Sequence, residues 1–217
     1  MKAVIFDLDG TLLNTIGTIA YYGNKALSAF GFQTATEEEY KYFVGNGAVK
    51  LIERALDKSG GWTREDFSKV YNYYNEIYNS KPLYLTGTFP GVGEMLKTLK
   101  DSGIKLGVLS NKPDEAVKGV VESFFGGIFD TVSGGKEGVP LKPDPSAVNI
   151  MLSSLGAEKA RSAFIGDSGV DMMTGNNASL HTIGVSWGFR TVDELKKAGA
   201  EHIVSSPGEI IKLIGAF

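Results

Sequence analysis

Short runs of β-branched residues alternate with helical segments over most of this chain. The strand-like runs are VIF before Asp7, IKLGVLS (104–110), IFDTVS (128–133), SAFIGD (162–167), HTIGVSW (181–187) and HIVSS (202–206). The segments between them have helical periodicity, and in GVGEMLKTLKDSG the residues on one face are Val92, Met95, Leu96 and Leu99. Strand and helix in steady alternation predict βαβ crossovers, and therefore an α/β fold with a parallel sheet covered on both faces.

Residues 15–84 interrupt this alternation, because they contain helical stretches and no strand-like run. Thr36 and Thr63 precede two of these stretches and are suitable N-caps. In a third stretch we expect an apolar stripe formed by Val49, Ile52 and Leu56. The chain is therefore expected to have an α/β core domain, residues 1–14 and 85–217, with a helical domain inserted at residues 15–84.

Composition narrows the class of protein. The formal net charge of −3 and the pI near 5.5 provide no electrostatic footprint for nucleic acid or for acidic membranes. With no cysteine and only two histidines, disulfides and thiolate metal sites are ruled out and a zinc site is disfavoured. No apolar run has the form of a signal peptide or reaches membrane-spanning length. We therefore expect a soluble cytoplasmic protein that binds neither nucleic acid nor membrane.

Polar side chains follow three of the expected strands at the point where each strand ends. They are Asp7 and Asp9 after the first, Ser110, Asn111 and Lys112 after the second, and Asp167 and Asp171 after the fourth. A further lysine, Lys142, lies in the loop LKPDP, where the flanking prolines restrict the backbone. Because ligands bind at the carboxyl ends of parallel strands, these groups are expected to lie together.

Converging carboxylates need a compensating charge. Two unit charges about 4 Å apart repel by roughly 4 kcal/mol at an effective dielectric constant near 20. A bound cation removes this repulsion, and because all the candidate ligands are oxygens, Mg²⁺ fits best.

Each pattern also has an ordinary structural explanation. The Asp-x-Asp-Gly sequence could be a turn or part of a calcium loop, and Ser-Asn-Lys could be a plain loop. Lys142 and Lys112 could be solvated surface charges, and Asp167 could cap the helix that follows it. The occurrence of all these groups in order, each after a strand or in a strand's loop, favours a shared site.

Four motifs of this chain resemble those of the haloacid dehalogenase-like hydrolase superfamily. They are DLDGTLLNT, SNK, Lys142 in LKPDP, and GDSGVD. Two further stretches, FVGNGAVKLIERAL and IGVSWGFR, are similar to the phosphoglycolate phosphatase branch. The resemblance spans essentially the whole chain and implies a Rossmann-like core, with residues 15–84 as the family's cap domain.

The resemblance implies a catalytic role for each motif. Asp7 would be the nucleophile that forms an aspartyl-phosphate, and Asp9 would be the general acid and base. Ser110 and the backbone amide of Asn111 would hold the phosphoryl oxygens. Lys142 would stabilise the charge on the nucleophile and on the transferring group.

The same resemblance implies a metal site. The Asp7 side chain, the Asp9 backbone carbonyl and Asp167 would bind Mg²⁺, and Asp171 would complete or orient that set. Asn14 departs from the first motif, where many relatives have aspartate. Because this position is at the hinge to the cap, the change is expected to affect substrate contact or closure more than chemistry.

Residues for substrate recognition are less clearly marked. Asn46 and Gly47, in the loop Gly45-Asn46-Gly47, could contact the substrate or could form a plain turn before a helix at 48–58. Arg190 could pair with a substrate carboxylate or could be a surface arginine.

The leading hypothesis is a Mg²⁺-dependent phosphatase for a small-molecule phosphomonoester, with 2-phosphoglycolate the first candidate. A sugar phosphate, a nucleotide or pyrophosphate could take its place, and a phosphosugar mutase shares every core motif. A dehalogenase would not need the proton chemistry of Asp9, and a non-catalytic binding module would be expected to lose at least one motif residue. No G-x-G-x-x-G follows any strand, which disfavours a nucleotide-binding oxidoreductase. A monomer and a homodimer both remain open.

Overall fold

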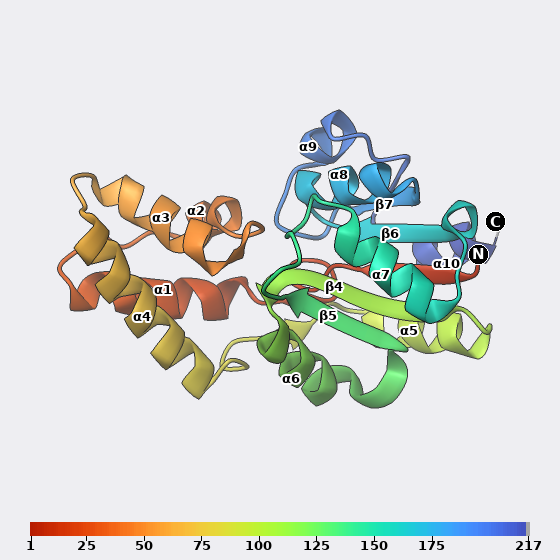
Figure 1. The fold of residues 1–217 in the computed structure, drawn as a ribbon, viewed down its shortest axis with the longest axis horizontal. Helices are drawn as coiled ribbons and strands as arrows, with labels where there is room; N and C mark the ends of the chain where they lie inside the picture. The colour runs from red at the N-terminus through yellow and green to blue at the C-terminus, as the bar shows by residue number, and fades with distance from the viewer. Residues whose placement is uncertain (216–217) are drawn as a thin grey trace. The chain divides into compact units, whose positions relative to one another are not determined.

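A computed structural model describes residues 1–215, and it contains a six-stranded parallel sheet. In chain order the strands are β1 (Ala3–Phe6), β4 (Lys105–Pro113), β5 (Thr131–Gly135), β6 (Ser162–Gly166), β7 (His181–Val185) and β8 (His202–Val204). Their order across the sheet is β5-β4-β1-β6-β7-β8. The predicted α/β fold with a parallel sheet is therefore confirmed (Figure 1).

Strand β1 occupies an inner position and pairs with β4 on one side and β6 on the other. The chain crosses from one half of the sheet to the other beside β1, which makes this the topological switch point where ligands bind in open α/β sheets. All four residues of β1 are fully buried, and this explains why the run is apolar on both faces.

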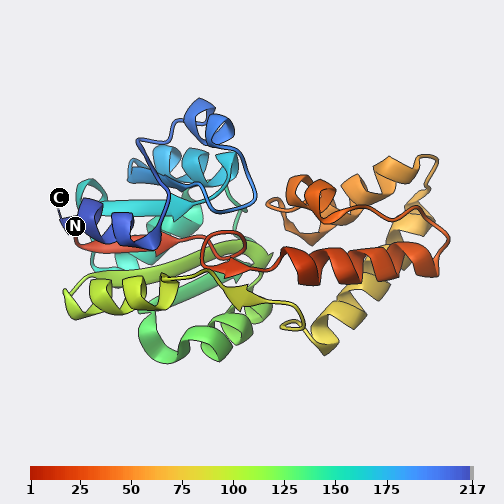
Figure 2. The ribbon, with the colours of Figure 1, turned by 180° about the vertical axis from the view of Figure 1, so that it is seen from behind.

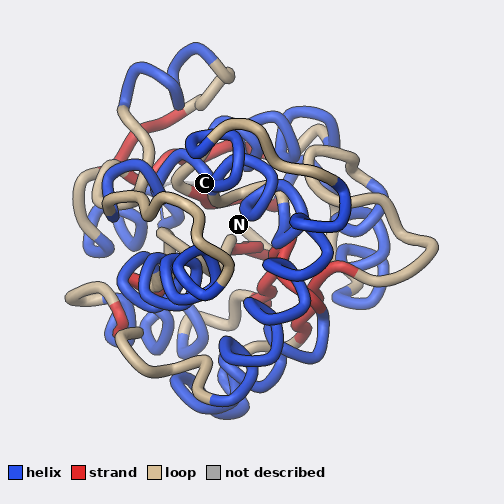
Figure 3. Tube along the Cα trace, turned by 90° about the vertical axis from the view of Figure 1, so that its left-hand side faces the viewer, coloured by secondary structure: helices blue, strands red, loops and turns tan. Residues whose placement is uncertain are grey.

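Helices cover both faces of the sheet. Val4 and Phe6 pack into one core cluster and Ala3 and Ile5 into the other, because alternate residues of a strand point to opposite faces. The first cluster is completed by α5 (Val92–Asp101), α6 (Asp114–Phe125) and α10 (Pro207–Gly215). The second is completed by α7 (Ser146–Leu155) and α8 (Gly169–Ala178). Figure 1 shows α7 on the near side, Figure 2 shows α5 and α10 on the opposite side, and Figure 3 shows the strands in red among blue helices.

The remaining elements of this part of the chain are short. They are α9 (Val192–Lys197) and two 3₁₀ turns, η1 (Gly126–Ile128) and η2 (Lys159–Arg161). Among the described residues, no helix combines the length and the apolar character needed to cross a bilayer.

The chain divides into two compact units, residues 1–14 with 88–217, and residues 15–87. The second unit contains α1 (Ile16–Ala29), α2 (Glu37–Phe43), α3 (Gly47–Ser59) and α4 (Arg64–Ser80). Two short strands, β2 (Leu13–Asn14) and β3 (Gly87–Thr88), pair with each other where the chain passes between the units.

Both N-caps predicted in the helical unit are confirmed. The Thr36 side chain accepts a hydrogen bond from the backbone N–H of Glu39, and the Glu39 carboxylate accepts one from the backbone N–H of Thr36. Thr63 and Asp66 form the same reciprocal pair at the start of α4.

Three local expectations were wrong. Of the stripe expected in α3, Ile52 and Leu56 are buried as expected, but Val49 is 43% exposed and Leu51 and Ala55 complete the apolar face. The strand expected from residue 128 begins at Thr131, because residues 126–128 form the turn η1. Strand β4 continues to Pro113, beyond the expected end at Ser110.

Candidate active site

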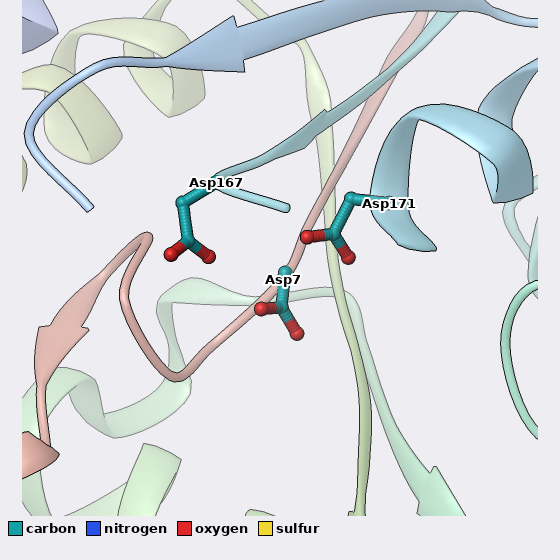
Figure 4. Close-up of side chains that lie close together, drawn as sticks. All are labelled: Asp7, Asp167 and Asp171. Carbon is teal, nitrogen blue, oxygen red and sulfur yellow. The ribbon is translucent and has the colours of Figure 1, made fainter. Parts of the chain in front are cut away.

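Three carboxylates meet at the carboxyl ends of the central strands (Figure 4). Asp7 directly follows β1, Asp167 directly follows β6, and Asp171 lies in the first turn of α8. Each carboxylate has an oxygen within 4.8 Å of an oxygen of the other two, and all three residues are buried. The grouping follows from the parallel pairing of β1 with β6, because neighbouring parallel strands end at the same edge.

Lys142 joins two of these carboxylates. Its Nζ lies 2.7 Å from Asp7 Oδ1 and 2.6 Å from Asp171 Oδ1, and its side chain is only 3% exposed. Burial acts to lower the pKa of Lys142, but the carboxylates of Asp171 and Asp7 outweigh it and raise that pKa above its usual value. The lysine therefore stays protonated, and the interpretation of Lys142 as a solvated surface charge was wrong.

The second oxygen of Asp171 is also engaged. Asp171 Oδ2 accepts hydrogen bonds from the backbone N–H and the hydroxyl of Ser168, at 3.0 and 2.6 Å. Ser168 is the N-cap of α8, and Asp171 completes its capping box. Asp167 therefore does not cap this helix, and both oxygens of Asp171 already have partners in the protein.

Backbone and hydroxyl donors hold the Asp167 carboxylate. Thr11 Oγ1 donates to Oδ1 at 3.2 Å, and the backbone N–H of Phe189 donates to Oδ2 at 2.7 Å. Burial and the nearby Asp171 carboxylate raise the pKa of Asp167 to about 7, although the Phe189 N–H opposes the shift. Burial, followed by Asp171, also raises the pKa of Asp7 well above its usual value.

Two glycines let the backbone approach Asp167 closely. A Cβ added at Gly10 or at Gly188 would overlap atoms of the Asp167 side chain. Gly10 also has φ +92°, a conformation that side-chain-bearing residues rarely adopt. The position of Asp167 is therefore fixed by steric confinement as well as by hydrogen bonds.

A pair of hydrogen bonds ties Asn111 to the Lys142 backbone. Asn111 Nδ2 donates to the Lys142 carbonyl at 3.1 Å, and the Lys142 N–H donates to Asn111 Oδ1 at 2.8 Å. This exchange fixes the loop that carries Lys142 to the end of β4. Ser110 is buried, and its hydroxyl oxygen accepts a hydrogen bond from the backbone N–H of Lys112 at 3.2 Å.

Asp9 is held apart from the three-carboxylate cluster. Lys112 Nζ lies 3.0 Å from Asp9 Oδ1 and 3.2 Å from Asp9 Oδ2. The Lys112 side chain is only 10% exposed, so the expectation that it is solvated was wrong.

The residues suggested for substrate recognition have different surroundings. Asn46 and Gly47 lie at the start of α3 in the helical unit, and Asn46 Oδ1 accepts a hydrogen bond from Arg54 Nη2 at 2.8 Å. The Arg190 side chain is 10% exposed and its Nε lies 3.4 Å from Glu194 Oε1, so the surface interpretation was wrong.

Thr11, Gly188 and Phe189 support the site, but none of them stands out in the sequence as a site residue. Trp187 adds to this support, because its Nε1 donates to the Thr11 carbonyl at 3.1 Å. One signal could have found the 187–189 segment: it follows β7, which pairs directly with β6. A loop at that strand end must lie close to Asp167.

The donor set fits a hard divalent cation. All three groups of the cluster are carboxylates, and two cations act on them: the Lys142 ammonium, which contacts Asp7 and Asp171, and the Arg190 guanidinium, whose charge lowers the pKa of Asp167. The raised pKa values of Asp7 and Asp167 reflect that excess of negative charge in a buried position. A cation bound here would remove the repulsion that these shifts report.

Comparison with known proteins supports the same chemistry. Residues 4–185 match the model of a family described as haloacid dehalogenase-like hydrolase. Phosphoglycolate phosphatase of Haemophilus influenzae strain 86-028NP is 34% identical over 219 residues, with 98% of both chains covered. That of Aquifex aeolicus is 30% identical over 216 residues, which cover 99% of this chain and 97% of the relative. The crystal structure of a proposed phosphoglycolate phosphatase from Lactobacillus delbrueckii subsp. bulgaricus superposes with a TM-score of 0.94 at 34% identity, covering 98% of both chains.

Proposed function

This chain belongs to the haloacid dehalogenase-like hydrolase family, and on that premise we propose that it is a Mg²⁺-dependent phosphatase acting through an aspartyl-phosphate on Asp7. It is a phosphomonoester hydrolase of the phosphoglycolate phosphatase-like branch. The proposed substrate is 2-phosphoglycolate, which is supported by relatives named phosphoglycolate phosphatase that match over nearly the whole chain.

One observation carries the proposal: a buried lysine bridges Asp7 and Asp171 beside Asp167. A purely structural network would be expected to balance its charges, because unpaired buried charge is costly. Here three carboxylates at the ligand-binding edge of the sheet face two cations, Lys142 between Asp7 and Asp171 and Arg190 near Asp167, so one negative charge remains unbalanced. Such an arrangement suits a site that receives a cation and a phosphate together.

In the first step Asp7 attacks the phosphorus atom of the ester. One oxygen of its carboxylate forms a new P–O bond while the bond from phosphorus to the substrate's alcohol oxygen breaks. Asp9, in its protonated form, gives its proton to that departing oxygen, so the alcohol leaves neutral. The Lys142 ammonium, 2.7 Å from Asp7 Oδ1, offsets the repulsion between the Asp7 carboxylate and the negatively charged phosphoryl group as the two approach.

In the second step water attacks the phosphorus of the aspartyl-phosphate. The bond between phosphorus and the Asp7 oxygen breaks, which regenerates the carboxylate and releases inorganic phosphate. Asp9, now ionised, accepts the proton of the attacking water and returns to its starting state. Ser110 and the Asn111 backbone amide would hold the phosphoryl oxygens through both steps.

The residues that would hold Mg²⁺ are Asp7 and Asp167, with the Asp9 backbone carbonyl. Asp171 is better suited to orienting Lys142, because its two oxygens are engaged by Lys142 and Ser168. The ion would supply Lewis-acid stabilisation of the phosphoryl oxygens and neutralise the excess negative charge.

The helical unit, residues 15–87, would act as the cap that selects the non-phosphate part of the substrate. Asn46 and Gly47 are proposed to contribute to that selection.

The experiment is to measure phosphate release from a panel of phosphomonoesters, with Mg²⁺ and with EDTA. The panel contains 2-phosphoglycolate, sugar phosphates, nucleotides and pyrophosphate. Asp7→Asn tests the nucleophile, and Asp101→Asn is the matched control, because Asp101 pairs with Lys97 on the surface of α5. We expect Mg²⁺-dependent release that prefers 2-phosphoglycolate and is lost only in Asp7→Asn. If no ester in the panel releases phosphate, the phosphatase proposal is wrong. If the protein prefers another ester, the assignment of 2-phosphoglycolate as the substrate is wrong.

A further inference from the structure

Four aspartates lie near the end of β1, but only three form the cluster. The exception is Asp9, whose two carboxylate oxygens both lie within hydrogen-bond distance of the Lys112 ammonium group, at 3.0 and 3.2 Å. The side chains of Asp9 and Lys112 are only 18% and 10% exposed. This contact is therefore shielded from solvent far better than an ordinary surface ion pair.

The fold places the Lys112 side chain beside Asp9. Strands β1 and β4 are parallel neighbours with Phe6 opposite Val108, so both chains leave the sheet at the same edge. Lys112 lies within the continuation of β4 that reaches Pro113, and its backbone N–H is fixed by the Ser110 hydroxyl. On the other side the backbone is packed tightly, because a Cβ at Gly134 would press against the Lys112 carbonyl. These contacts fix the Lys112 backbone beside Asp9, and the side chain reaches both Asp9 oxygens from there.

We propose that Lys112 is a positioning residue for Asp9: its ammonium group holds both carboxylate oxygens and keeps this acid out of the metal cluster. The two lysines would thus divide four carboxylates into two functional sets. Lys142 serves Asp7 and Asp171, whereas Lys112 reserves Asp9 for proton transfer. The inference rests on the proposed function, since it assigns a supporting residue to the proton step.

The physical reason is competition. A carboxylate close to a bound cation would be drawn to it as a further oxygen ligand, and a metal-bound carboxylate is a poor proton donor. An ammonium group on both oxygens opposes that movement in two ways. It gives the carboxylate a competing partner, and its positive charge makes the space beside Asp9 less favourable for a cation.

The test compares Lys112→Met with Lys112→Arg. Methionine has similar length without charge, and arginine retains a cation that can hold a carboxylate through two parallel hydrogen bonds. Lys100→Met is the matched control, because Lys100 pairs with Asp130, whose side chain is also 18% exposed, on a different part of the unit. The readout is kcat/KM, which reports the steps up to alcohol release, for three esters: 2-phosphoglycolate, ethyl phosphate and p-nitrophenyl phosphate.

We expect Lys112→Met to lower kcat/KM for both alkyl esters by about 100-fold, the lower range for loss of general acid catalysis. The p-nitrophenyl ester should lose less than about tenfold, because its leaving group departs without needing a proton. Lys112→Arg should recover part of the loss, and Lys112→Met should add nothing in an Asp9→Asn background. Equal losses for all three esters would overturn the proposal in favour of a structural role. A loss confined to 2-phosphoglycolate would overturn it in favour of direct binding of the substrate carboxylate.

A second measurement does not depend on activity. Calorimetric titration with Mn²⁺ should show tighter binding to Lys112→Met than to the wild type or to Lys100→Met, because Asp9 becomes available as a ligand. Equal Mn²⁺ affinity in all three proteins would contradict the proposal even if the phosphatase activity is established. Conversely, if the wild type releases no phosphate but Lys112→Met still binds Mn²⁺ more tightly than the wild type does, the proposed reaction is wrong and the positioning role of Lys112 is retained.

Discussion

Lys142 and Asp7 are 135 positions apart in the chain and 2.7 Å apart in the folded protein. Their contact joins a loop before α7 to the end of β1, across the switch point of the sheet. It forms when the loop that follows β5 is brought to the end of β1, and the sheet order β5-β4-β1 allows this. The ion pair therefore reports the assembled β5-β4-β1 part of the core and, at the same time, engages the proposed nucleophile.

Replacing Lys142 should damage both stability and activity. Lys142→Met leaves Asp7 and Asp171 buried without their ammonium partner, and breaking such a pair costs about 3 kcal/mol of unfolding free energy. It should lower kcat by at least about 100-fold, the size of effect seen when one charge-stabilising donor is removed. Urea unfolding and initial rates measure the two effects. A variant with wild-type kcat would contradict the role of Lys142 in transition-state stabilisation.

The stability of the metal-free protein should fall as the pH rises from about 4 towards 7. The pKa of Asp167 is raised to about 7 in the folded state, so between those pH values the folded state holds a proton that the unfolded state has lost. The stabilising contribution is present at low pH and disappears as the pH passes the folded pKa. Thermal unfolding in EDTA measures this slope, and Asp167→Asn, which cannot titrate, should flatten it.

Addition of Mg²⁺ should reverse that trend. Because a metal ligand must be deprotonated, the increase in melting temperature on adding Mg²⁺ should grow between pH 5.5 and 8. An increase that is the same at every pH would show that the ion binds away from Asp167.

Gly188→Ala should disable the site while leaving most of the fold intact. The new methyl group would overlap the Asp167 side chain and displace it from the Phe189 N–H. We expect weaker Mg²⁺ binding, measured by calorimetry, and a large loss of kcat.

Gly93→Ala is the matched control for that substitution. Gly93 lies inside α5, has no atom within contact distance of an added Cβ, and has no left-handed φ. Alanine there should stabilise the protein by about 0.5–1 kcal/mol, because it lowers the entropy of the unfolded chain. If Gly188→Ala and Gly93→Ala have the same Mg²⁺ affinity and the same kcat, the steric argument for Asp167 is contradicted.

Arg54→Met should change substrate affinity more than chemistry. Arg54 donates to Asn46 Oδ1 at 2.8 Å and to the Phe43 carbonyl at 2.9 Å, so it holds the loop before α3. Arg54 also donates to the Tyr42 carbonyl at 3.3 Å, and loss of these hydrogen bonds at roughly 1 kcal/mol each should raise KM about tenfold or more. The control is Lys50→Met, which removes only the exposed ion pair with Glu53 on the same helix. Loss of kcat at unchanged KM would contradict a recognition role for this loop.

Structural features that depend on chain direction or on local periodicity could be predicted from the sequence. Parallel strands end at one edge, so the meeting of Asp7 with Asp167 could be anticipated from the polar residues that follow the β1 and β6 runs. The N-caps Thr36 and Thr63 could be anticipated because their hydrogen bonds reach only three residues along the chain.

What depends on side-chain direction in the assembled core could not be predicted. Lys112 follows a buried strand, and nothing local shows that its ammonium group points to Asp9 instead of solvent. Val49 fits the helical period of α3, yet the buried face lies over Leu51 and Ile52, because packing against the other helices decides which stripe is covered. Gly188 supports Asp167 through the close approach of its backbone to the Asp167 side chain, which no residue pattern encodes.

The central claim is that Asp7 carries the phosphoryl group, and rapid quenching with ³²P-labelled substrate tests it most directly. Wild-type protein is mixed with labelled ester in the presence of Mg²⁺, stopped in acid within milliseconds and digested. The account predicts hydroxylamine-sensitive label on the peptide that contains Asp7, and none in Asp7→Asn. Label on a different residue, or turnover by Asp7→Asn at the wild-type rate, would contradict it.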